Sequence, residues 1–115
     1  MDTNYMVKDN QLIINNHHVN FLFPIRTAQI LDGNIIVLLA IPFNNDTVDN
    51  LYLIDTNGEI VWQSQKLKEL YPTEKLLPYE QMVIDEQGIR VTDFYGRRYF
   101  IDLSNGKIIK RDIIK

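Results

Sequence analysis

The chain has 115 residues, no cysteine and a formal net charge of −3 at pH 7. This length suits one domain with a modest core, and the lack of cysteine excludes disulfides and thiolate-bound zinc. The first residues lack the basic start and apolar run of a signal peptide. The longest apolar run, residues 35–42, is too short to cross a bilayer, so we expect a cytoplasmic protein without membrane contacts.

The charge is distributed unevenly along the chain. Residues 1–64 carry seven acidic and two basic side chains, whereas residues 65–115 carry eight acidic and ten basic ones. An acidic first half attracts a basic partner and disfavours nucleic acid. The alternative interpretation is scattered charge that interacts only with solvent.

Residues 1–24 are predicted to form an N-terminal hairpin. Its expected strands are residues 5–8, 12–14 and 17–23. In the last of these, Val19, Phe21 and Phe23 recur at every second position, which is typical of a half-buried strand. Pro24 should end the pairing because it has no N–H to donate.

Residues 25–64 are predicted to form a first sheet unit. Its expected strands are residues 25–30, 34–41, 51–55 and 59–63. The strand over residues 35–41 is apolar on both faces, which predicts a central strand covered on both sides. Residues 43–50 form the longest polar loop of the chain.

Residues 65–78 are predicted to form a helical connector between two sheet units. Ser64 is the expected cap of a helix that runs to Tyr71, and Pro72 should stop it. A further helical turn is expected over residues 73–77.

Residues 79–115 are predicted to form a second sheet unit. Its expected strands are residues 79–84, 88–94, 97–103 and 107–111. The last hairpin repeats that of the first unit, because residues 98–109 echo residues 51–62 around an Asn-Gly turn. Asp55 and Asp102 precede these turns and should bond to their backbone. A sequence repeat with a period of about 45–50 residues is typical of propeller blades.

The motif from Tyr52 through Asp55 and Gly58 to Trp62 resembles blades of quinoprotein-type β-propellers. The second copy is similar, but Lys110 stands where the resemblance implies a tryptophan. The resemblance implies blade-like packing only. Quinoprotein catalysis needs a complete ring with a cofactor and calcium in its channel, and two blades form no channel.

The expected fold is therefore mainly β in a single domain, residues 1–115. It has two antiparallel four-stranded sheets resembling a half-propeller, one short helix and the N-terminal hairpin. Two blades leave two outer faces without neighbours, and a large apolar face needs cover. That cover could be the N-terminal strands, the helix, a second copy or a different partner.

The end of the sheets with the long loops is the predicted partner-binding site, because such loops carry function and aromatic side chains favour interfaces. The candidate residues are Phe43, Asn45, Asp46, Asp49, Tyr71 and Tyr95. We expect no catalytic residue, cofactor or metal site. The two histidines, His17 and His18, are adjacent and should point to opposite faces of a strand. Basic residues near the C-terminus are expected to protect an exposed sheet edge.

These observations predict a non-enzymatic protein–protein binding module. More weakly, a short, acidic, cysteine-free β domain resembles bacterial immunity proteins of contact-dependent growth inhibition systems, which implies that it binds and neutralises a cognate, basic toxin domain. Two alternatives remain open at this point. One is a small homo-oligomeric β protein of structural role, such as a homodimer. The other is a ligand-binding or enzymatic domain with a pocket between its sheets.

Overall fold

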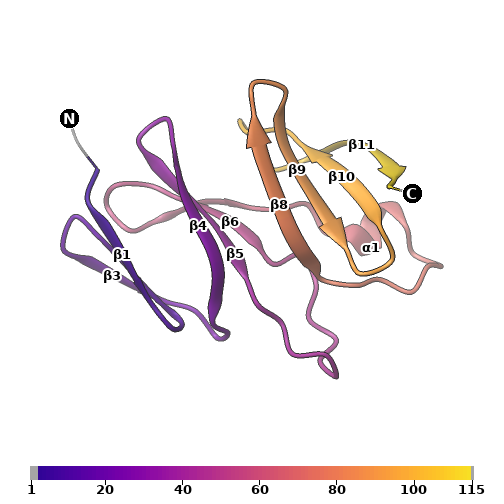
Figure 1. Cartoon of the computed structure of the whole chain (residues 1–115), viewed down its shortest axis with the longest axis horizontal. Coiled ribbons are helices and arrows are strands. Elements are labelled where there is room, and N and C mark those ends of the chain that lie inside the picture. The colour runs from indigo at the N-terminus through magenta and orange to yellow at the C-terminus, as the bar shows by residue number, and fades with distance from the viewer. Residues whose placement is uncertain (1–2, 115) are drawn as a thin grey trace.

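The structure is a computed structural model that describes residues 3–114. It contains three antiparallel β-sheets, arranged one after another along the longest axis, and one short helix (Figure 1). In chain order the elements are β1 (Tyr5–Lys8), β2 (Gln11–Ile14), β3 (His17–Asn20), β4 (Ile25–Leu31), β5 (Asn34–Leu39), β6 (Leu51–Ile54), β7 (Ile60–Gln63), α1 (Leu67–Leu70), β8 (Tyr79–Asp85), β9 (Gly88–Asp93), β10 (Arg97–Ile101) and β11 (Ile108–Ile113).

Each sheet is built from strands that are consecutive in the chain. The orders are β1-β2-β3 in the N-terminal sheet, β4-β5-β6-β7 in the middle sheet and β8-β9-β10-β11 in the C-terminal sheet. The prediction of a mainly β fold with two four-stranded antiparallel sheets is confirmed.

The three strands predicted for the N-terminal segment form one three-stranded sheet. Its last strand ends at Asn20 and does not continue to residue 23 as predicted. One further bond, from the Phe21 N–H to the carbonyl of Asn10, follows this strand, and beyond it the Leu22 side chain is 92% exposed. Phe21 and Phe23 still pack against the core. The alternation of apolar residues therefore predicted their burial correctly, but it predicted a strand that is too long.

Strand β5 is apolar throughout because its two faces lie in two different hydrophobic cores. Ile35, Val37 and Leu39 belong to the core between the N-terminal and middle sheets. Ile36 and Leu38 belong to the core between the middle and C-terminal sheets. Successive side chains of a strand point to opposite faces, so a strand between two cores must be apolar throughout.

Each Asn-Gly turn of the repeat joins two strands of one sheet and packs against the preceding sheet. As predicted, Asp55 and Asp102 accept backbone N–H bonds from their own turns, at 2.9 Å from Asn57 and 2.9 Å from Ser104. Gly106 adopts φ +75° and lies directly on the ring of Trp62, where a Cβ would come within 2.6 Å of Cε3. The Trp62 indole N–H also donates to the carbonyl of Leu103 at 2.7 Å. The middle and C-terminal sheets are therefore joined at this point.

The connector between the sheets has less helix than predicted. Helix α1 is one turn, and Ser64 does not cap it. Instead, the Asp49 carboxylate accepts the Leu67 N–H at 3.0 Å, from a position 18 residues earlier in the chain. No helix forms over residues 73–77, because this part of the chain is held by side-chain bonds to the C-terminal sheet.

Of the two outer sheet faces that were expected to need cover, one is covered by another sheet and the other carries charged side chains. The N-terminal sheet covers one face of the middle sheet, with Leu12 and Ile14 fully buried there. The outer face of the C-terminal sheet is not a continuous apolar surface, since Arg90, Arg98 and Lys110 lie on it.

Candidate protein-binding groove

A groove of about 580 Å³ lies where the long loops meet, between the middle and C-terminal sheets. Its walls are residues 41–46 of the β5–β6 loop, residues 75–78 of the connector and residues 94–95 of the β9–β10 turn, with Arg26 and Glu80 between them. These loops lie at the opposite end of the sheets from the β4–β5 and β8–β9 turns (Figure 1).

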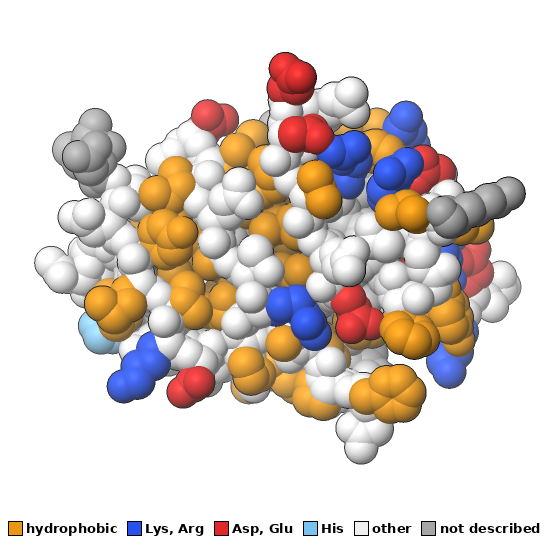
Figure 2. All heavy atoms as spheres, in the orientation of Figure 1, with side chains coloured by type: hydrophobic (Ala, Val, Ile, Leu, Met, Phe, Trp, Pro, Cys, Tyr) orange, Lys and Arg blue, Asp and Glu red, His pale blue; other side chains and the backbone are white. Residues whose placement is uncertain are grey.

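Three aromatic side chains at the groove are unusually exposed. Phe43 is 100% exposed, Phe94 71% and Tyr95 57%. In Figure 2, hydrophobic side chains gather along the lower edge of the molecule, where the β5–β6 loop lies. Exposed aromatic side chains that cluster around a depression are typical of interaction surfaces.

Arg26 and Glu80 place one charge of each sign at the groove. Their side chains form a loose ion pair at 3.9 Å, and each is 40% exposed. Each residue is the extra residue of a β-bulge, between Ile25 and Thr27 in β4 and between Tyr79 and Gln81 in β8. The two units of the repeat thus contribute equivalent positions with opposite charge, and a bulge re-aims its side chain out of the regular sheet pattern.

Two further charged side chains lie at the groove without a counter-ion. Neither Asp46 nor Lys75 forms an ion pair within residues 3–114. Because no side chain of the described residues neutralises these charges, they are available to attract an opposite charge on a partner.

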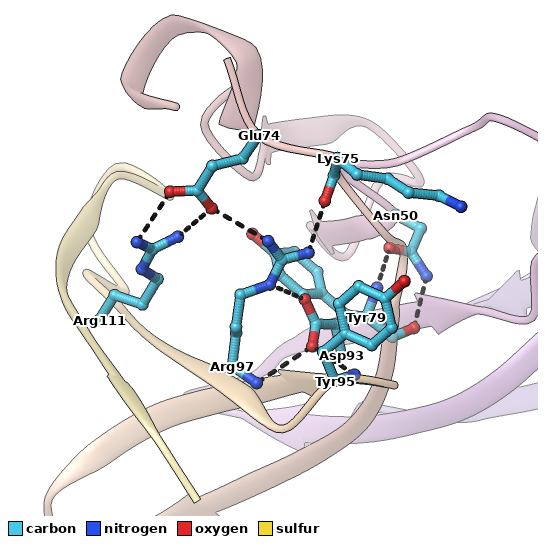
Figure 3. Close-up of polar contacts among 8 residues, drawn as sticks. All are labelled: Asn50, Glu74, Lys75, Tyr79, Asp93, Tyr95, Arg97 and Arg111. Atoms are coloured by element: carbon cyan, nitrogen blue, oxygen red, sulfur yellow. Dashed lines mark hydrogen bonds and ion pairs between the residues drawn. The ribbon is translucent and has the colours of Figure 1, made fainter. Parts of the chain in front are cut away.

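The β5–β6 loop is anchored by Asn50, a residue that the sequence did not single out. Its buried side chain accepts the Tyr79 N–H and donates to the Tyr79 carbonyl, at 2.9 Å each (Figure 3). It also donates to the carbonyl of Leu39 at 2.8 Å. The Asn50 side-chain amide thus links the end of the loop to the first residue of β8. The loop that carries Phe43 therefore starts and ends on fixed backbone.

The β9–β10 turn is held by a second polar network (Figure 3). The buried Asp93 carboxylate accepts the backbone N–H groups of Tyr95 and Arg97 and pairs with the Arg97 side chain at 2.7 Å. Arg97 continues to Glu74 at 3.0 Å and to the carbonyl of Lys75 at 2.8 Å. One guanidinium thus fixes the turn that bears Tyr95 to the connector that forms the opposite wall.

The structure brings together four of the six predicted site residues. Phe43, Asn45, Asp46 and Tyr95 line the groove. Asp49 lies outside it at the start of α1, and burial raises the pKa of its carboxyl, with the Leu67 N–H acting in the opposite direction. Tyr71 lies under the Arg111 guanidinium, 3.9 Å from its ring centroid. These last two residues support the connector and do not reach the groove.

Glu74 makes the support of the groove dependent on pH. Bidentate bonds from Arg111, at 2.7 and 3.0 Å, lower the pKa of Glu74 below its ordinary value of 4.5, and Arg97 adds to this effect. A lowered pKa in the folded state stabilises the fold above the ordinary pKa, and this contribution is lost as pH falls through the lowered value. We expect urea unfolding to show that the wild type loses stability as pH falls below 4.5, the ordinary pKa of this carboxyl. Glu74→Gln should reduce that loss, and an equal loss in both proteins would contradict the assignment.

Residues 3–114 contain no group of three His, Asp or Glu side chains placed to hold a metal ion. Over the same residues, no helix has the length and apolar character needed to cross a membrane.

Comparison with known proteins identifies the family and supports the fold. Residues 2–113 match the family described as Domain of unknown function (DUF7957), so the chain belongs to that family. A search of curated proteins gives no match. Among solved structures, the crystal structure of the computationally designed Ika8 protein is similar, with a TM-score of 0.61 and 7% sequence identity. That likeness covers 96% of this chain and 32% of Ika8, so the chain spans about a third of its length.

Proposed function

We propose that the chain is a non-enzymatic protein-binding module that holds its partner in the groove. The observation that carries this proposal is the set of three exposed aromatic side chains, Phe43, Phe94 and Tyr95, on loops that buried polar networks hold in place. A rigid aromatic surface loses little conformational entropy on binding. The partner that fits presents an apolar side chain to the groove and a basic one to Asp46.

A more specific form of the proposal makes that partner a toxin domain, with this chain as its cytoplasmic immunity protein. The net acidic character of residues 1–64 and the free carboxylate of Asp46 support a basic partner. Coexpression with the product of the neighbouring reading frame would test this form, which requires a complex between the two proteins and protection from the toxin.

The groove is tested by affinity measurements on single variants. A partner captured from the native host would be identified, purified and titrated calorimetrically against the wild type and Phe43→Ala. We expect Phe43→Ala to weaken binding by about tenfold or more, because a central aromatic anchor dominates such interfaces. Leu22→Ala is the matched control, since Leu22 is equally apolar and exposed but lies away from the groove.

The same titration with Asp46→Lys tests the charge of the partner. We expect weaker binding to a basic surface, together with a smaller dependence on salt. Asp49 is unsuitable for this substitution because its carboxylate caps the Leu67 N–H. Unchanged affinity in both Phe43→Ala and Asp46→Lys would reject the groove as the contact surface.

A small-molecule site is the second candidate, and the volume of the groove favours it. A depression of about 580 Å³ lies within the size range of ligand pockets, and its walls combine apolar side chains with polar and charged ones. A small ligand would depend on Arg26 and Glu80 between the two sheets, whereas a protein would depend on the rim aromatics. Loss of binding in Arg26→Ala with full binding in Phe43→Ala would favour this second candidate.

A further inference from the structure

Across strands β5, β6 and β7, the face of the middle sheet that receives the C-terminal sheet is apolar at its paired positions. Strand pairing places Ile36 beside Leu53 and Leu53 beside Trp62 in one row, and Leu38 beside Leu51 in the next. All five side chains are buried in the core between these sheets. This face shows what a further sheet of this kind requires in order to pack.

Strands β9, β10 and β11 of the C-terminal sheet pair in the same way, so each of these positions has an equivalent on the outer face of that sheet. Arg90 pairs with Phe100 and Phe100 with Lys110 in the first row, and Thr92 pairs with Arg98 in the second. Position by position, the apolar residues Ile36, Trp62, Leu38 and Leu51 of the middle sheet are replaced by Arg90, Lys110, Thr92 and Arg98. The Lys110 position is decisive, because Trp62 is the residue on which Gly106 of the next sheet packs.

The charged side chains form a self-contained layer on this outer face. Arg90 pairs with Asp85, and Arg98 forms two bonds to Asp112, at 2.8 and 2.7 Å. The Lys110 ammonium lies 4.5 Å from the ring centroid of Phe100, which it shields together with Arg98. Covering this layer with another sheet would bury several ions without new partners, which costs several kcal/mol per ion.

The outer face of the N-terminal sheet, at the opposite end of the molecule, is mixed, because the apolar residues Met6 and Ile13 pair on it. In the N-terminal sheet, Lys8 pairs with Gln11 on the outer face, at the positions that Val37 and Tyr52 occupy in the middle sheet. The Gln11 amide also donates to Asn20 across the sheet at 3.0 Å.

We infer that the outer face of the C-terminal sheet is an end cap, which prevents a second copy of the chain from adding its sheets and extending the arc toward a ring. Repeat proteins commonly end in units whose outer face is polar, for the same reason. The chain acts as a single three-sheet arc, which argues against the homo-oligomeric alternative and leaves one groove for each copy. This inference does not depend on what the groove binds.

The cap is tested by restoring the apolar face. The variant Arg90→Ile, Arg98→Leu and Lys110→Trp copies the middle sheet, and Arg90→Gln, Arg98→Gln and Lys110→Gln is the matched control that removes the same charges. Light scattering over a concentration series should give monomer mass for the wild type and control, and about twice that mass or more for the apolar variant.

Circular dichroism and thermal unfolding establish that each variant is folded before its mass is compared. If the triple variant does not fold, Lys110→Trp alone replaces it, and we expect weaker, concentration-dependent association. A folded apolar variant that stays monomeric at high concentration would overturn the inference. So would a wild-type dimer that Lys110→Glu dissociates.

Discussion

Arg97→Ala is expected to lower the free energy of unfolding by about 3–5 kcal/mol, the usual cost of removing one partner of a buried ion pair. The reason is the Asp93 carboxylate, whose side chain is 0% exposed and whose only ion-pair partner among the described residues is Arg97. The same substitution releases Glu74 and the carbonyl of Lys75, so the connector loses its attachment to the β9–β10 turn.

Arg98→Ala is the matched control for this measurement. Arg98 is the next residue along β10 and also forms an ion pair, with Asp112, but that pair lies on the solvent-exposed outer face. Exposed ion pairs contribute little to stability, so urea unfolding should change only slightly. Equal losses in the two variants would show that the network under the groove is not buried as described.

Gly106→Ala is expected to destabilise the fold by about 2–4 kcal/mol, as the sum of backbone strain and overpacking. The backbone at Gly106 has φ +75°, and an added Cβ would lie 2.6 Å from the Trp62 ring. Since Trp62 joins the middle sheet to the C-terminal sheet, the ring cannot move away without weakening that junction.

Gly88→Ala separates the two causes. Gly88 also has positive φ, at +111°, but an added Cβ would have nothing within 4 Å. We expect a loss of about 1–2 kcal/mol from strain alone. Thermal or urea unfolding of both variants provides the comparison, and a loss at Gly106 no larger than at Gly88 would mean that the Trp62 contact does not constrain the turn.

The strands could be predicted because their signals are local. Alternation around Val19, the doubly apolar β5 and the Asn-Gly turns at Gly58 and Gly106 each report on a few neighbouring residues, and the structure places strands at all of them. The cap of α1 could not be predicted in this way. Ser64 precedes the helix in sequence, but the carboxylate that bonds Leu67 comes from Asp49, which only the folded chain brings there.

The groove was partly predictable for the same reason. Phe43 and Asp46 belong to a visibly polar, long loop, and Tyr95 to a tight turn, so their end of the sheets followed from strand order. The position of Arg26 and Glu80 at the groove could not be predicted from the sequence. Their side chains reach it because each residue lies in a β-bulge, and no sequence motif marks these bulges.

The two-faced packing of β5 has a consequence for how the chain could be shortened. Removal of the N-terminal sheet would expose Ile35, Val37 and Leu39 to solvent. Removal of the C-terminal sheet would expose Ile36 and Leu38. Neither outer sheet can therefore be cut away as an independent module, although the repeat suggests separable parts. The three sheets form one cooperative unit whose smallest stable form is the whole arc.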